Sequence, residues 1–282
     1  MNAAQGHGNC RPFFDRPYAK ENSPRQTYDL VLPRGASGRL GLVFCIHGGG
    51  WAQGDKSEYR DALLQVCQAK GVAAAALNYR FVSNTVGFAD MLDDITAALA
   101  AIRAQGAACG VDLDRVLLTG ISAGGHLSLL YAYARKDAAP IRPVCAVTLC
   151  GPADLTYGFY YNADPGAPRI VDAAYYRDVI GKGIRTVIPP DDFTPAKPAL
   201  ADWSPINYVD ETAVPTVFGH GEEDAVVPYR TATELDAKLT ACRVPHTFIS
   251  FPQSGHGCED KAALAAIMRS FFACVDQYLK SE

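Results

Sequence analysis

Short apolar runs alternate along most of the chain with segments in which apolar residues repeat every three or four positions. The runs cover residues 40–46, 71–79, 115–120, 144–150, 215–221 and 246–251. Runs that stay apolar throughout are typical of strands buried on both faces of a sheet. Between them, apolar positions fall on one side of a helix, as do Met91, Leu92, Ile95, Leu99 and Ile102. The alternation predicts an α/β fold, with a mostly parallel central sheet and helices on both faces.

The two ends of the chain follow different patterns. Residues 27–32 alternate only partly between apolar and polar, which favours an antiparallel strand at the edge of the sheet. Residues 1–26 show no such pattern and are expected to form an N-terminal extension. Residues 260–279 have the periodicity of a helix. We therefore expect one domain over residues 27–282.

The interval 152–213 is longer than a single crossover helix between two strands requires. It is rich in proline and tyrosine, and its many aromatic side chains indicate that much of it packs on the rest of the fold. We interpret it as a cap or lid insertion over the carboxyl ends of the strands, with Phe159, Tyr160 and Tyr161 against the substrate. The alternative is that these rings only fasten the insert to the sheet.

A serine stands at a sharp junction between a predicted strand and a predicted helix. The sequence Gly-Ile-Ser-Ala-Gly at residues 120–124 follows an apolar run and opens a segment rich in alanine and leucine. In such a turn only small residues fit beside the serine, whose hydroxyl projects above the edge of the sheet. Ser122 is therefore the candidate nucleophile, and a simple helix cap is the alternative.

A serine hydroxyl needs a base, and the base needs an acid that orients it. His256 lies in a glycine-flanked loop after the last predicted strand, where it can reach the carboxyl edge of the sheet. Asp224 follows the preceding strand and is the preferred acid, with Asp154 as its rival. The chain order Ser122, Asp224, His256 is that of the α/β-hydrolases. Packing or backbone hydrogen bonding is the expected role of His47, His126, His220 and His246.

Three consecutive glycines follow the first long apolar run, in the sequence His-Gly-Gly-Gly-Trp at residues 47–51. Each glycine loses much conformational freedom on folding, so bare backbone must be needed there. Attack on a carbonyl creates an oxyanion, which fixed backbone N–H groups stabilise. We expect these donors from Gly49, Gly50 and Ala123, the residue after the nucleophile. Trp51 is expected to contact the substrate.

Composition narrows the classes of partner and site. The net charge of −4 and the pI near 5.9 argue against nucleic acid and anionic membranes as partners. We find no run that approaches the ~20 apolar residues of a membrane span and no signal peptide, so a cytoplasmic location is expected. The nine cysteines are expected to be reduced, and no ligand spacing typical of a metal site occurs.

Several motifs together resemble one group of enzymes. They are HGGGWAQGDK at 47–56, NYR at 78–80, GISAGGHLSLL at 120–130, WSPINYV at 203–209, HGEEDAVVP at 220–228 and SGHG at 254–257. The chain resembles, over about residues 27–280, the α/β-hydrolase esterases and lipases that include small bacterial carboxylesterases, feruloyl-type esterases and arylformamidases. The resemblance implies the triad Ser122, Asp224 and His256, a glycine oxyanion loop, and neither a metal nor another cofactor.

These motifs predict a serine carboxylesterase that hydrolyses small short-chain or aryl carboxylic esters through an acyl-enzyme on Ser122. An arylformamidase, which would use the same triad on an N-formyl amide, is the alternative within this class. A non-catalytic binding protein that keeps the hydrolase fold is the alternative outside it.

Overall fold

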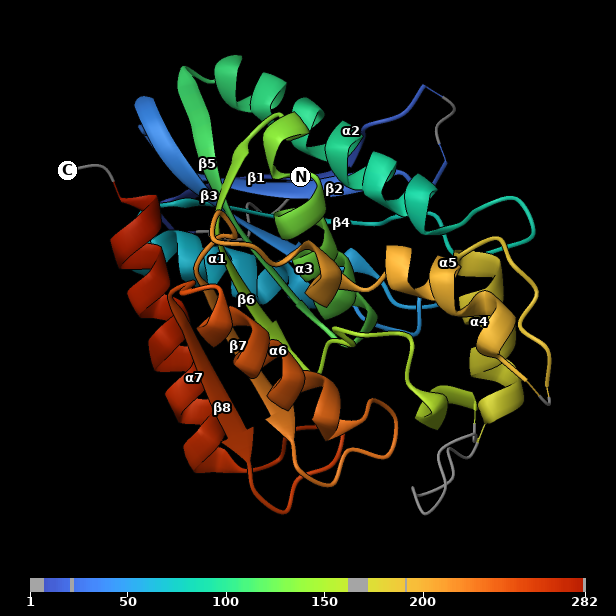
Figure 1. Ribbon diagram of the computed structural model, residues 1–282. Helices are drawn as coiled ribbons and strands as arrows, with labels where there is room; N and C mark the ends of the chain where they lie inside the picture. The colour runs from blue at the N-terminus through green and yellow to red at the C-terminus, as the bar shows by residue number, and fades with distance from the viewer. Residues whose placement is uncertain (1–7, 21–22, 162–171, 191, 281–282) are drawn as a thin grey trace.

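An eight-stranded sheet runs through the computed structural model, which describes residues 8–20, 23–161, 172–190 and 192–280 (Figure 1). The strands are β1 (Cys10–Pro17), β2 (Thr27–Pro33), β3 (Gly38–Ile46), β4 (Ala73–Leu77), β5 (Val111–Ile121), β6 (Arg142–Leu149), β7 (Thr216–Gly221) and β8 (His246–Phe251). Their order in the sheet is β1-β2-β4-β3-β5-β6-β7-β8. The β1–β2 and β2–β4 pairs are antiparallel, and the remaining pairs are parallel. The predicted mostly parallel sheet is confirmed.

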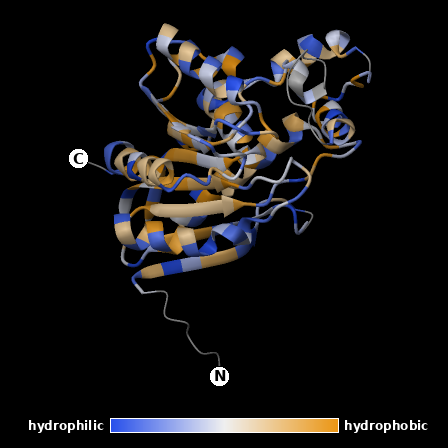
Figure 2. Cartoon of the chain, turned by 90° about the horizontal axis from the view of Figure 1, so that it is seen from below, coloured by the Kyte–Doolittle hydropathy of each residue, from blue (hydrophilic) through white to orange (hydrophobic). Residues whose placement is uncertain are grey.

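Helices cover both faces of this sheet, which explains why the interior strands β3, β4 and β6 are largely apolar. On one face lie α2 (Phe88–Ala107), α3 (Ala123–Ala134) with the short η2 (Lys136–Ala138) after it, and α6 (Tyr229–Ala241). On the other lie α1 (Arg60–Lys70) and α7 (Lys261–Cys274). Phe44 of β3 belongs to the first core and its neighbour Val43 to the second. Figure 2 shows apolar strands between helices that carry polar residues on part of their surface.

The first edge of the sheet differs from the prediction. β1 pairs with β2, so β2 is an interior strand, and the segment before residue 27 contributes to the sheet instead of forming a separate extension. β1 contains Pro12 and Pro17, and its register is irregular between Phe13 and Arg16. Prolines and irregularities are tolerated at an edge because not every backbone N–H needs a partner there. A strand of this composition has no regular alternation, so the sequence pattern did not predict it.

Buried charges fasten β1 to the segment that precedes α1. Lys56, in η1 (Lys56–Tyr59), has a side chain only 2% exposed, and its Nζ lies 2.5 Å from Asp15 and 3.0 Å from Asp29. The fully buried Asp29 also accepts a 2.6 Å hydrogen bond from Arg60 Nε. A buried carboxylate is tolerated only when cations and donors surround it, as they do here.

The last helix has the length and composition of a membrane span, contrary to the prediction that no run approaches one. α7 continues into η6 (Val275–Leu279), and the 19 residues Lys261–Leu279 contain a window with a hydropathy of 1.2. Core helices of globular proteins pass the same test. Ile267, Phe271 and Val275 are buried in the core on the α1 side of the sheet, and 33% of the apolar window is buried in all.

The described part of the interval 152–213 packs against the helical layer. It holds η3 (Gly158–Tyr161), α4 (Ala173–Gly183), η4 (Thr194–Ala196), α5 (Lys197–Asp202) and η5 (Pro205–Tyr208). Ile180 and Leu200 are buried in the same core as α2 and α3. The guanidinium of Arg230 in α6 lies 5.1 Å from the centre of the Tyr157 ring. The insert is thus anchored at several points along its length.

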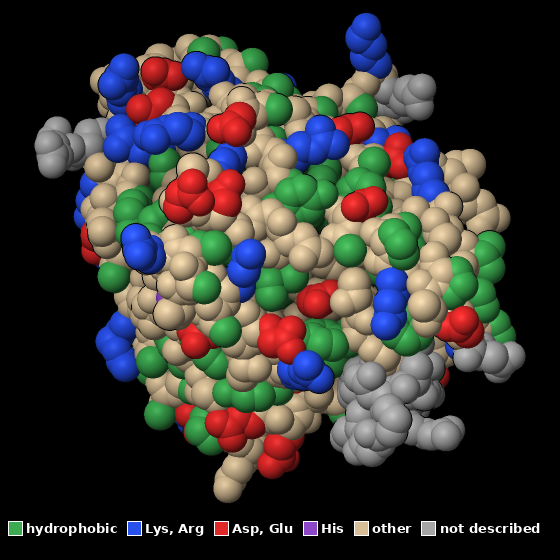
Figure 3. All heavy atoms as spheres, viewed as in Figure 1, with side chains coloured by type: hydrophobic (Ala, Val, Ile, Leu, Met, Phe, Trp, Pro, Cys, Tyr) green, Lys and Arg blue, Asp and Glu red, His purple; other side chains and the backbone are tan. Residues whose placement is uncertain are grey.

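The outer surface mixes both signs of charge. On the face drawn in Figure 3, basic and acidic side chains are interspersed among apolar ones. On this face the mixture of charges agrees with the small net charge of −4.

Candidate active site

Ser122 stands at the apex of the turn between β5 and α3, with φ 56° and ψ −122°. A positive φ is costly for a residue with a side chain, so the surrounding packing must impose it. A Cβ added to Gly124 would lie 2.0 Å from the Ile46 carbonyl oxygen, and one added to Gly120 would lie 2.5 Å from the Gly124 backbone. The turn therefore needs both glycines. The Ser122 N–H donates to the Leu149 carbonyl at 2.8 Å, which ties the turn to β6.

Ser122, His256 and Asp224 form a continuous chain of hydrogen bonds. The Ser122 hydroxyl donates to His256 Nε2 at 2.9 Å, and His256 Nδ1 donates to Asp224 Oδ2 at 2.7 Å. The three residues follow β5, β8 and β7, whose carboxyl ends meet at one edge of the sheet. The carboxylate of the rival Asp154 instead accepts hydrogen bonds from Thr156. The structure thus brings together the predicted residues, with Asp224 as the acid.

Asp224 is held as a carboxylate although it is buried. Burial opposes its ionisation, but hydrogen bonds from His220 and His256 outweigh burial and hold the pKa of the carboxyl well below its usual range. Oδ1 accepts the backbone N–H groups of Val226 and Val227, each at 2.8 Å. A permanent negative charge beside Nδ1 of the catalytic imidazole favours the tautomer whose Nε2 can accept a proton.

The turn that presents His256 is held on both sides. The Gly255 N–H donates to Glu259 Oε2 at 3.1 Å, and the Asp260 N–H donates to the Ser254 hydroxyl at 3.0 Å. Asp260 also caps α7 by accepting the Ala263 N–H at 2.7 Å. The sequence analysis did not identify these supporting residues, although an aspartate just before a helical pattern is a recognisable cap.

The predicted oxyanion donors lie around Ser122. Gly49 and Gly50 line a cavity that Ser122 also lines. Their φ values of 101° and 56° favour glycine. A Cβ on Gly49 would lie 2.3 Å from the Gln53 carbonyl oxygen. Ala123 is the first residue of α3, where N–H groups lack partners within the helix and the helix dipole is positive. This backbone can therefore stabilise negative charge next to the serine hydroxyl.

A neutral His47 anchors the glycine loop. Its Nδ1 donates to the Gly48 carbonyl at 2.8 Å, so its Nε2 is the acceptor for the Arg25 guanidinium at 2.9 Å. The imidazole stacks on the ring of Tyr79 at 4.3 Å. Burial lowers the pKa of His47 to about 4, and the charge of Arg25 acts in the same direction. The loop is therefore built on an uncharged imidazole.

His126 supports the other end of the loop in the same way. It accepts a 3.2 Å hydrogen bond from Trp51 Nε1 and donates through Nε2 to the Trp203 carbonyl at 2.8 Å. Burial lowers its pKa to about 4. With His220 and His246, which bond to the carbonyls of Val227 and Val244, all four histidines expected to bond to backbone do so.

A cavity of about 560 Å³ opens beside Ser122. The glycine loop lines part of it, and Tyr160, Tyr176 and Ile180 of the insert line another part. Ile121, the residue before the nucleophile, also lines the cavity and is exposed. The sequence analysis identified only Tyr160 of these four, because contacts made by an insert depend on how it folds back.

The other predicted substrate contacts have different outcomes. Trp51 borders the cavity, but its ring is only 4% exposed and its N–H is used by His126, so most of it serves packing. The side chains of Phe159 and Tyr161 lie outside the described residues, and their predicted role stays a prediction.

A cysteine thiol also lies beside the triad. The sulfur of Cys150 and the ligand atoms of Asp224 and His256 lie within 4.8 Å of one another, a spacing that could hold a metal. The Asp224 carboxylate and the His256 imidazole are already hydrogen-bonded to each other in the triad. The Cys150 thiol takes no part in that series of hydrogen bonds.

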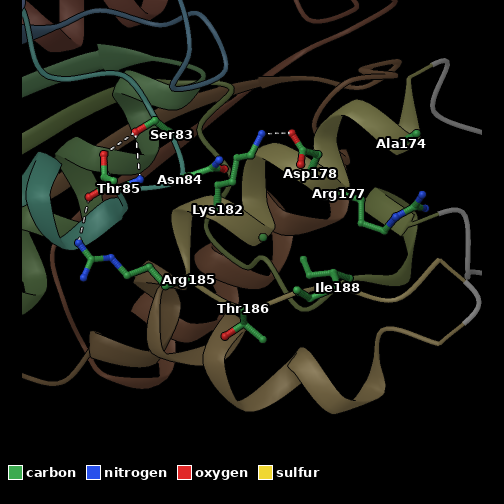
Figure 4. A pocket seen from close by; sticks show the side chains of 12 residues that line it. Ser83, Asn84, Thr85, Ala174, Arg177, Asp178, Lys182, Arg185, Thr186 and Ile188 are labelled. Atoms are coloured by element: carbon green, nitrogen blue, oxygen red, sulfur yellow. Dashed lines mark hydrogen bonds and ion pairs between the residues drawn. The ribbon is translucent and has the colours of Figure 1, made fainter.

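A larger cavity of about 730 Å³ lies between residues 83–85 and the part of α4 that carries Arg177, Asp178 and Lys182 (Figure 4). Two of its cationic side chains are paired with carboxylates: Lys182 lies 2.6 Å from Asp178, and Arg185 lies 2.6 Å from Asp90. The nucleophile and base line the smaller cavity, so the chemistry is assigned there.

The chain is similar to several known proteins. Residues 28–239 match the family model BD-FAE. The probable carboxylic ester hydrolase LipM and the esterase LipC, both from Mycobacterium tuberculosis, are 27% and 28% identical, over 78% and 77% of this chain. This chain spans about half the length of each, 50% and 52%.

A solved structure, a truncated carbohydrate esterase from gut microbiota, superposes with a TM-score of 0.74 at 23% identity. The superposition covers 93% of this chain and 95% of that one. It shows the fold, which is that of the α/β-hydrolases as the sequence predicted. The family model covers most of the described sheet and the turn that carries Ser122. The chain therefore belongs to the BD-FAE family.

Proposed function

We propose that this protein is a serine carboxylesterase that hydrolyses small carboxylic esters through an acyl-enzyme on Ser122. The observation that carries the proposal is the hydrogen-bonded chain from Ser122 through His256 to Asp224, which opens on a cavity lined by bare glycine backbone. The ester hydrolase names of the relatives support the same reaction class.

The geometry suggests how each group acts. As the Ser122 oxygen attacks the ester carbonyl, His256 Nε2 takes its proton, and Asp224 stabilises the imidazolium that results. The N–H groups of Gly49, Gly50 and Ala123 stabilise the oxyanion. The imidazolium then gives its proton to the leaving alcohol, and water repeats the sequence on the acyl-enzyme.

The lining of the cavity supports short acyl chains or aryl groups as substrates. The half-buried ring of Tyr176 offers a flat face for stacking and Ile121 exposes apolar surface, while the buried Tyr160 and Ile180 form part of the wall of a cavity of about 560 Å³. The insert would act as the lid that the sequence predicts, because its side chains bound the space beside the nucleophile.

A substrate screen with active-site labelling tests the proposal. We expect hydrolysis of p-nitrophenyl acetate, with activity falling as the acyl chain lengthens, and stoichiometric labelling by a fluorophosphonate that Ser122→Ala abolishes. Turnover of N-formylkynurenine in preference to aryl esters would favour an arylformamidase instead. Absence of both turnover and labelling would indicate a non-catalytic binding protein.

A further inference from the structure

Two buried cysteines meet beside the triad. The sulfurs of Cys150 and Cys258 lie 2.8 Å apart, although the residues are 108 positions apart in the chain. Their exposed fractions are 1% and 5%, and both are free thiols in the structure. Cys150 directly follows β6, and Cys258 lies two residues beyond His256. The pair thus joins two elements that position catalytic groups.

The backbone at both cysteines is unusual in the same way. Cys150 has φ 48° and Cys258 has φ 52°, in the left-handed region that glycine adopts most easily. A residue with a side chain is costly there, and two such residues face each other with their thiols in contact.

Each cysteine is rigidly linked to a part of the triad. The residue before Cys150, Leu149, accepts the N–H of Ser122 at 2.8 Å, and the Cys150 N–H donates to Gly219 of β7 at 2.9 Å. The Cys258 N–H donates to the Gly255 carbonyl at 3.3 Å and closes the turn around His256. A covalent bond between the sulfurs would therefore join the end of β6, whose Leu149 carbonyl holds the Ser122 turn, to the turn that presents the base.

We propose that Cys150 and Cys258 are an oxidation site, at which a disulfide forms reversibly and fastens the His256 turn to the end of β6. The contact with Cys150 favours the thiolate of Cys258 and lowers its pKa, whereas the same contact and burial raise the pKa of Cys150. Cys258 lies in the turn around His256 and is the more exposed of the two, at 5% against 1%, so it is the attacking sulfur, and Cys150 resolves the intermediate.

The reaction partner is a low-molecular-weight disulfide. The Cys258 thiolate attacks one of its sulfurs, forms a mixed disulfide and releases a thiolate. The Cys150 sulfur then attacks Cys258, its proton leaves with the second small thiol, and the protein disulfide is complete. Two protein thiols are oxidised and one small disulfide is reduced to two thiols. Because both cysteines are buried, the step requires the turn at 255–258 to open.

The disulfide is expected to stabilise the fold without remodelling the triad. The sulfurs need to approach by less than about 1 Å to reach bonding distance, so the His256 turn can stay in place. The closed loop of about 108 residues includes β7 and Asp224. Constraining a loop of this length is expected to raise the melting temperature by about 5 to 10 °C.

The test uses the full chain equilibrated with mixtures of reduced and oxidised glutathione. Free thiols are blocked, and the protein is digested with trypsin without reduction. The expected product links the peptide of residues 137–169, which contains Cys145 and Cys150, to that of residues 244–261, which contains Cys258. Cys150→Ala should abolish this link, which distinguishes Cys150 from Cys145.

A matched control comes from a second thiol pair away from the triad, Cys10 and Cys67, whose sulfurs lie 3.0 Å apart. The comparison is made in Cys67→Ala, which cannot form the Cys10–Cys67 pair: its melting temperature should still rise on oxidation, and adding Cys258→Ala to it should remove that rise. Absence of the linked peptide at every glutathione ratio overturns the proposal, as does a link that survives in Cys150→Ala. If Cys258→Ala does not fold, equal melting temperatures of oxidised and reduced wild type overturn it instead.

Discussion

At the scale of single residues, Ser122 can be changed with little effect on packing, because it is only half-buried at the tip of a turn made by its neighbours. We expect Ser122→Ala to lower kcat by about 10⁴- to 10⁶-fold, since the remaining groups supply only oxyanion stabilisation and binding. The melting temperature should stay within about 2 °C of wild type. Steady-state kinetics on p-nitrophenyl acetate and a thermal melt measure both.

His256→Ala should lose a similar factor, and the double variant should lose little more, because nucleophile and base act as a unit. Asp224→Asn removes the charge that orients the imidazole and should also lose activity strongly. Asp154→Asn is the matched control, since its carboxylate bonds to Thr156 and not to the histidine. If Asp154→Asn is the inactive variant and Asp224→Asn the active one, the assignment of the acid is wrong.

At the scale of elements, the glycine loop depends on two histidines that must stay neutral. Both have a pKa lowered to about 4 from the ordinary 6.5. Between pH 4 and 6.5 the folded state therefore binds fewer protons than the unfolded state. The contribution of these two histidines to the free energy of unfolding is fully present above about pH 6.5 and is lost as the pH drops toward 4. Each histidine should contribute about 1 kcal/mol per pH unit in this window. Urea unfolding at several pH values measures the slope.

His126→Gln isolates one of the two contributions. A glutamine amide can accept from Trp51 and donate to the Trp203 carbonyl, but it does not titrate. The slope of stability against pH should fall by about half in this variant. An unchanged slope would show that other groups cause the acid sensitivity.

The insert is the element that is expected to select the substrate. Tyr160→Ala and Tyr176→Ala should each widen the cavity and shift the preference toward longer acyl chains, because both rings line it. Tyr175→Ala is the control, since this neighbouring ring is 46% exposed and does not line the cavity. Ratios of kcat/KM for acetate, butyrate and octanoate esters provide the measurement. A preference unchanged in all three variants, with lower stability in the first two, would mean that the rings only fasten the insert.

The limits of sequence-based prediction also lie at this scale. Strands β3 to β7 were predictable because burial on both faces leaves mostly apolar runs, and the half-exposed edge strand β8 still follows a run rich in apolar residues. β1 was not, because Pro12, Pro17 and its charged residues suit an edge whose partner cannot be read from the pattern. Ser122 follows from a local motif, and the sequence also favoured Asp224 over Asp154, although both follow a strand; the hydrogen bond from His256 to Asp224 agrees with that preference. Tyr176 and Ile180 were missed because their place at the cavity depends on how the insert folds back.

At the scale of the whole molecule, the buried charge cluster at Lys56 joins the first strand to the rest of the sheet. Lys56→Met would leave the fully buried Asp29 with only part of its cationic surroundings, so the free energy of unfolding should fall by about 3 kcal/mol. Lys182→Met removes a solvent-exposed ion pair with Asp178 and should cost less than about 0.5 kcal/mol. Urea titrations of the two variants compare them, and equal losses would contradict this account of β1.

Because the triad residues are widely separated along the chain, the return of catalytic activity reports on a late step of folding. Ser122 and His256 are 134 residues apart, and the base follows β8, the last strand in both sequence and sheet order. Contacts between such distant segments form late, because a long loop must close first. Fluorescence of the two tryptophans, Trp51 and Trp203, whose rings both lie near Phe88 of α2, should therefore recover before ester turnover returns. In a refolding experiment, the time at which hydrolysis begins measures when β8 and the His256 turn have packed.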